Sequence, residues 1–242
     1  MKKKILMIGN TDGLSGVPVD IASYYSFFTN PIGGNWCREE IDVMLNPSQR
    51  CAFNKIVEIE EAAYDYVITI FAGHGNEADD DIVLIINEQE DTILMSDLTN
   101  LSQKQLIILD CCREPIQMAV DFAFIETRAT MLSMSQDPIR RAYEDRILHC
   151  PPQEIILFSC DQGEMAKDTA SYSSHLLHAV EMVLADSHSP FVSVNRAHER
   201  AVSLLEANRF YTQQHPQIQQ SRCLINRRLP FAVNTKLWGI YD

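Results

Sequence analysis

Four continuous apolar runs constrain the fold of this chain more than any other feature of its sequence. They occupy residues 3–9 (KKILMIG), 66–73 (YVITIFAG), 105–111 (QLIILDC) and 154–160 (EIILFSC). A strand that is exposed on one face alternates apolar and polar residues, whereas a strand covered on both faces is apolar throughout. The runs therefore predict the buried strands of a mostly parallel sheet.

Segments with a helical or hairpin pattern separate these runs. The helices are expected at residues 17–28, 48–66, 171–186 and 194–208, and a small hairpin at residues 81–88 and 91–95. Strands that alternate with helices form right-handed βαβ units, which place helices against the sheet. We therefore expect an α/β fold built around a mostly parallel central sheet.

One polar segment interrupts this alternation. Residues 128–152 contain Arg140 and Arg141 and end in two consecutive prolines. We interpret the segment as a long, partly mobile connection between two of the buried strands. Long connections of this kind are often functional.

Composition excludes several classes of function. The chain has 242 residues, a formal net charge of −13 and seven cysteines. Phosphate binding needs clustered basic residues, so a nucleic-acid partner is not expected, whereas basic peptides would be attracted. An odd number of cysteines without a CxxC pair argues against a disulfide framework and a zinc site. No apolar stretch approaches about 18 residues, so we expect a cytoplasmic protein without a membrane span.

Polar residues directly follow three of the apolar runs. His74 lies between two glycines after the second run, Cys112 follows the third run, which ends in Cys111, and Asp161 follows the last one. Chemistry gathers at the carboxyl ends of parallel strands, so these side chains are expected at one edge of the sheet. A thiolate is a strong nucleophile and needs a base, which a histidine at the same edge can supply.

The GHG after one buried strand and the D-x-C-R after the next resemble motifs of the caspase-like cysteine peptidases, especially metacaspases and their bacterial relatives. The resemblance continues through NTDGLSGVPVDI (10–21), SCDQGEMAKD (159–168), QQHPQ (213–217) and LPFAV (229–233). It implies a caspase-like three-layer sandwich with helices on both faces, formed by residues 1–242 as a single domain. That domain would comprise a large-subunit-like part (1–127), an interconnecting and processed segment (128–152) and a small-subunit-like part (153–242).

The resemblance also implies the catalytic residues. The nucleophile of the family stands two residues after the strand-end acid, which identifies Cys112. Neighbouring side chains on a strand point to opposite sides, so Cys111 is expected in the core. His74 would deprotonate Cys112 or protonate the leaving amine, and backbone N–H groups of Gly75 and Cys112 would bind the oxyanion. Asp110 is expected to support the backbone of the active site.

The resemblance also implies which residue is recognised before the cleaved bond. Metacaspases use acidic residues to bind the Arg or Lys that precedes the cut, and the matching positions are Asp20 and Asp161. Two carboxylates suit the planar fork of a guanidinium, so Arg is expected to be preferred over Lys. Asp20 could instead be a charge that stabilises the start of a helix. One departure is Val17, where metacaspases commonly have a cysteine. The resemblance makes Arg140 and Arg141 candidate autoprocessing sites.

Two other functions stay open at this stage. A catalytically silent scaffold could keep the fold, although the presence of both His74 and Cys112 argues against it. A nucleotide could bind near Gly9, Gly13 and Gly16, which lie between a strand and a helix. Their spacing does not match G-x-G-x-x-G, so this signal is weak.

The expected partner is a protein or peptide substrate with a basic residue before the cut, and an activating partner or ligand is also compatible with the sequence. No cofactor or metal is expected from the residues themselves. Many metacaspases require calcium, and an acidic chain could bind it. The sequence contains no EF-hand-like loop, however, so it leaves a calcium requirement open. A role in bacterial stress or antiphage defence is suggested only by the small, free-standing form of the chain.

Overall fold

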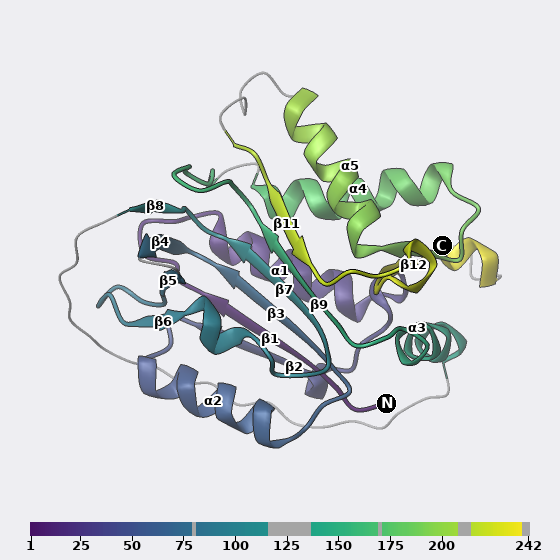
Figure 1. The fold of residues 1–242 in the computed structure, drawn as a ribbon, viewed down its shortest axis with the longest axis horizontal. Helices are drawn as coiled ribbons and strands as arrows, with labels where there is room; N and C mark the ends of the chain where they lie inside the picture. The colour runs from purple at the N-terminus through teal and green to yellow at the C-terminus, as the bar shows by residue number, and fades with distance from the viewer. Residues whose placement is uncertain (79–80, 116–136, 169–170, 208–213, 239–242) are drawn as a thin grey trace.

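A six-stranded sheet forms the centre of the computed structural model, which describes residues 1–78, 81–115, 137–168, 171–207 and 214–238 (Figure 1). In spatial order its strands are β11 (Gln217–Gln220), β9 (Gln153–Phe158), β7 (Lys104–Asp110), β3 (Tyr66–Ala72), β1 (Lys3–Gly9) and β2 (Ile41–Leu45). All neighbours in this sheet are parallel except β11, which runs antiparallel to β9. The predicted mostly parallel sheet is confirmed.

The central strands bury side chains on both faces of the sheet. On β1, Ile5 and Met7 belong to one hydrophobic core, whereas Leu6 and Ile8 belong to the other. The first core is covered by α1 (Val17–Thr29), α3 (Pro138–Leu148), α4 (Tyr172–Asp186) and α5 (Val194–Ala207). The second core is covered by α2 (Gln49–Glu61) and a smaller sheet (Figure 1). The predicted three-layer arrangement is therefore confirmed.

The smaller sheet has the order β6-β5-β4-β8. Its strands are β4 (His74–Ala78), β5 (Asp81–Ile85), β6 (Thr92–Leu94) and β8 (Glu114–Pro115). The antiparallel pair β5–β6 is the hairpin that the sequence predicted. Strand β4 was not predicted, because its sequence HGNEA contains no apolar run. It pairs with β8, so the residues after His74 lie beside those after Cys112.

Several other elements were not predicted from the sequence. They are β2, β11 and β10 (Phe191–Ser193). Strand β10 pairs antiparallel with β12 (Pro230–Val233), which lies within the segment LPFAV (229–233), where the resemblance implied a strand. Helix α3 corrects the interpretation of residues 128–152 as a connection, since residues 138–148 are helical. Its buried Ile139, Tyr143 and Ile147 follow helical spacing, a signal that the charged residues between them obscured. Residues 128–136 lie outside the described part of the chain.

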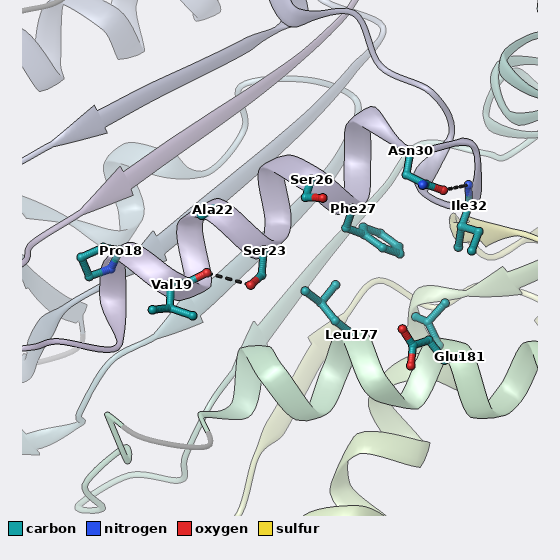
Figure 2. Close-up of a pocket in the computed structure, with 11 residues that line it drawn as sticks. Pro18, Val19, Ala22, Ser23, Ser26, Phe27, Asn30, Ile32, Leu177 and Glu181 are labelled. Carbon is teal, nitrogen blue, oxygen red and sulfur yellow. Dashed lines mark hydrogen bonds between the residues drawn. The ribbon is translucent and has the colours of Figure 1, made fainter.

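Helix α1 presents two different faces. Asp20 and Tyr24 are buried on the side that faces the sheet. On its outer side, α1 and α4 border a groove of about 700 Å³, to which Phe27 and Leu177 contribute apolar surface and Glu181 a carboxylate (Figure 2). Within the described residues, no helix is long and apolar enough to cross a membrane.

Candidate active site

His74 and Cys112 follow two strands that are neighbours in the sheet. In the register of β3 and β7, Ala72 pairs with Asp110, so each side chain lies two residues beyond a paired position. Gly75 brings the two segments into direct contact, because a Cβ added there would lie 2.6 Å from Cys111 Sγ and 2.9 Å from the Cys112 carbonyl oxygen. The structure thus places the His74 and Cys112 segments against each other at one edge of the sheet.

The ring of His74 is held by the first loop of the chain. Its Nε2 atom lies 2.8 Å from the carbonyl oxygen of Asp12. A carbonyl oxygen only accepts hydrogen bonds, so Nε2 must carry the hydrogen. In the neutral ring the other nitrogen, Nδ1, is then the one that can accept a proton. This contact fixes both the orientation and the tautomer of the histidine.

The two adjacent thiols lie in different environments. Cys111 is 2% exposed and belongs to the second core, where burial raises the pKa of its thiol well above the usual value. Cys112 is half-buried, and its Sγ lies 3.9 Å from the carbonyl oxygen of Ala166. A buried thiol that stays protonated is a poor nucleophile. The prediction that Cys111 is a core residue is confirmed, and Cys112 is the better placed of the two for chemistry.

Arg113 anchors the backbone immediately after Cys112. Its N–H donates to the Glu164 carbonyl oxygen at 2.9 Å, and its own carbonyl oxygen accepts from Gly163 N at the same distance. Its guanidinium lies 3.3 Å from Glu77 Oε1 and 4.6 Å from the centre of the Phe158 ring. Arg113 was visible in the D-x-C-R motif, but the sequence did not show what it would contact.

Two buried carboxyl groups lie beside this edge of the sheet. Asp20, in the first turn of α1, accepts a hydrogen bond from Ser171 Oγ at 2.8 Å. Asp110, at the end of β7, accepts from Ser173 N at 2.9 Å and from Ser173 Oγ at 2.6 Å. Burial and then the nearby charge of Asp110 raise the pKa of Asp20 to about 7. Burial also raises the pKa of Asp110.

Asp168 contributes a third carboxyl group to this cluster. It accepts from the N–H of Gly16 at 2.9 Å, and its charge acts on both Asp20 and Asp110. Asp161, which the sequence paired with Asp20, is exposed and accepts from the N–H of its neighbour Gln162. The charges that raise the pKa of Asp20 thus come from Asp110 and Asp168. The sequence did not suggest this arrangement, because Asp110 was interpreted as a support of the backbone and the course of the loop after Asp161 was unknown.

Arg140 and Arg141 do not lie in an exposed connection, which corrects the setting assumed for autoprocessing. Arg140 is 7% exposed, and its NH2 atom lies 2.5 Å from Glu40 and 3.0 Å from Glu144. Lys3, also buried, lies 3.1 Å from Glu144. Arg141 is exposed, but it too belongs to α3. Cleavage after either arginine would require this helix to unfold.

The adjacent arginines provide a stability test. Replacing Arg140 with Ala should lower the free energy of unfolding by about 3 kcal/mol, because the carboxylates of Glu40 and Glu144 would lose one of their two buried cationic partners. Replacing the exposed Arg141 with Ala should change it by less than about 0.5 kcal/mol. Urea denaturation of both variants measures the difference. Equal losses would show that the ion cluster around Arg140 does not stabilise the fold.

A mostly parallel sheet covered by helices, with a histidine and a cysteine after adjacent strands, defines the class of caspase-like proteins. The family model described as the caspase domain matches residues 2–225, so the chain belongs to that family.

Solved structures agree with this assignment at the level of the fold. Protein GSU0716 from Geobacter sulfurreducens superposes with a TM-score of 0.58 at 15% identity, over 96% of this chain and 99% of that chain. Caspase-1 from Spodoptera frugiperda superposes with a TM-score of 0.56 at 13% identity, over 95% and 89%. No curated protein matches the chain.

Proposed function

We propose that the chain is a cysteine endopeptidase that cuts proteins after a basic residue, with Arg preferred over Lys. The observation that carries the proposal is the placement of His74 and Cys112 after the paired strands β3 and β7, with their segments in contact at Gly75. Membership of the caspase family supports a cysteine-peptidase reaction. The substrate would be a protein or peptide, and the acidic chain would attract basic segments of it.

The proposed reaction proceeds through an acyl-enzyme. His74 Nδ1 takes the proton of the Cys112 thiol, and the resulting thiolate attacks the carbonyl carbon of the peptide bond. Backbone N–H groups of Gly75 and Cys112 stabilise the oxyanion of the tetrahedral intermediate. The amine leaves with the proton from His74, and water then hydrolyses the thioester. Asp12 supports the cycle through its carbonyl oxygen, which orients the His74 ring.

The proposed selectivity arises from the carboxyl groups of Asp20, Asp110 and Asp168. Neighbouring carboxylates repel one another, and burial adds to the cost of charging them. A guanidinium that enters beside them would relieve the repulsion and form charge-assisted hydrogen bonds. Lys brings the same charge without the planar fork of donors, so Arg is preferred. In this proposal Asp110 and Asp168 take the role that the sequence had assigned to Asp161.

Replacing Asp20 with Asn should therefore reduce kcat/KM for cleavage after Arg by about a hundredfold, because a buried charge partner is lost. The rate at which iodoacetamide alkylates Cys112 should stay unchanged, since that neutral reagent does not need the pocket. The matched control is Asp161→Ala, which removes an exposed carboxylate and should leave cleavage after Arg unchanged. A hundredfold loss in the Asp161 variant alone would show that the pocket for Arg is formed by the loop that contains Asp161.

A peptide-library cleavage profile, recorded with and without calcium, tests the function itself. We expect cuts after Arg and, more slowly, after Lys. A peptidyl electrophile with Arg at its reactive end should label Cys112. Absence of cleavage and labelling under both conditions would favour a catalytically silent scaffold, and cuts after Asp would contradict the acidic pocket.

The cellular setting is part of the proposal. An odd number of cysteines suits the reducing cytoplasm. A role in bacterial stress or antiphage defence would require a trigger such as a partner protein, a small molecule or calcium.

A further inference from the structure

The start of α4 is built around hydrogen bonds to the two buried carboxyl groups. Ser171 precedes the first residue of α4, and its Oγ accepts from the N–H of Ser174 at 3.2 Å. Because this hydroxyl oxygen accepts from the backbone, its single proton is available for Asp20, whose Oδ1 lies 2.8 Å away. The hydroxyl therefore donates to Asp20.

Ser173 donates hydrogen bonds to Asp110, as Ser171 does to Asp20. Its N–H and its hydroxyl both donate to Asp110 Oδ2. Ser171 and Ser173 are 3% and 0% exposed, so water does not compete for these bonds at the serines. Donors that bind the charged form of a carboxyl group favour that form, and they oppose the effect of burial.

We propose that Ser171 and Ser173 are specificity-determining residues, which keep the carboxyl groups of the pocket charged at the pH where the enzyme selects Arg. This inference rests on the proposed function, since it concerns the same pocket. Neither serine was singled out from the sequence. Their role is to set the charge of Asp20 and Asp110 rather than to contact the reacting atoms.

The other charged groups around Asp20 act in the opposite direction. Asp110 on β7 and Asp168 in the loop before α4 both raise the pKa of Asp20, which reaches about 7. Tyr24, one turn further along α1, is buried beside the same acids, and burial raises the pKa of its hydroxyl well above its usual value. Ser171 lowers the pKa of Asp20, so its loss should shift the ionisation of Asp20 to higher pH.

The test compares two peptides that differ only in Arg or citrulline before the cut. Citrulline has nearly the shape of Arg without its charge, so the Arg/citrulline ratio of kcat/KM reports the charge of the pocket and cancels the titration of His74 and Cys112. In the wild-type protein we expect this ratio to fall as pH decreases through about 7, where Asp20 gains a proton.

In Ser171→Ala the midpoint should rise by about one pH unit, the effect expected for one lost hydrogen bond to a carboxylate. The ratio should then be about fivefold lower at pH 7 and recover at pH 9. Ser171→Thr keeps the hydroxyl and should restore the wild-type midpoint. Ser174→Ala is the matched control, because its hydroxyl binds the Ser171 carbonyl oxygen and neither carboxyl group.

The possible outcomes separate this inference from the proposed function. An unchanged midpoint in Ser171→Ala, in a protein that does cut after Arg, would overturn the inference alone. A fivefold drop at every pH, without a shift, would indicate a structural role and would also overturn it. A wild-type protein that cuts neither peptide would overturn the proposed function and the inference together.

Discussion

Replacing Cys112 with Ala is expected to abolish peptide cleavage, with a loss in kcat/KM of about four orders of magnitude or more. Without the sulfur no acyl-enzyme can form, and no other described thiol can take its place at this edge. Cys111 faces the second core, and the Cys160 thiol is also buried, which raises its pKa to about 12. Fluorogenic Arg peptides measure the effect, and circular dichroism shows whether the variant is folded.

Cys111→Ala is the matched control for this prediction. Removing the buried Cys111 sulfur should cost about 1 kcal/mol of stability and leave most of the activity. The two variants differ by one position, but Cys111 is buried in the second core and Cys112 is only half-buried, so their effects on activity should differ. If Cys111→Ala were inactive and Cys112→Ala retained activity, the assignment of the nucleophile would be wrong by one residue.

The core strands and the long helices of this fold could be predicted from the sequence because they follow clear hydrophobic patterns. The apolar runs over residues 3–9 and 105–111 have almost the same bounds as β1 and β7. Strand β4 and helix α3 carry weaker patterns. The stabilisation of α3 comes partly from the ion pair between Arg140 and Glu40, which lies far away in the chain, and such a contact leaves no local signal.

The sequence also predicted that the segments of His74 and Cys112 would lie near each other. Each residue follows a strand of the predicted parallel sheet, and the carboxyl ends of parallel strands lie at the same edge. The proximity of His74 and Cys112 was therefore expected. The surroundings of Asp20 depend instead on how the loop before α4 packs against the start of α1. That loop brings Asp168 and Ser171 to the start of α1, through contacts between residues more than 150 positions apart. No pattern in a single sequence specifies such contacts.

Replacing His74 with Ala should reduce kcat/KM by about two to four orders of magnitude, the usual contribution of a general acid–base residue. The same change should slow the alkylation of Cys112 by iodoacetamide at neutral pH, because the thiol loses the group that accepts its proton and less of it is present as the reactive thiolate. His178→Ala is the matched control, since His178 lies on the exposed side of α4 with 60% of its side chain accessible. Peptide cleavage and thiol alkylation, measured on the same samples, compare the two variants.

The contact between His74 Nε2 and the Asp12 carbonyl oxygen makes this prediction more specific. An Asn in place of His74 can still donate a hydrogen bond to that carbonyl oxygen, but it cannot accept a proton at neutral pH. If His74 acts as the base, His74→Asn should therefore be as inactive as His74→Ala. If the residue mainly tethers the first loop to β4, Asn should restore much of the activity. Restored cleavage in the Asn variant would show that His74 does not transfer protons. The residues proposed for catalysis would then include no base for Cys112.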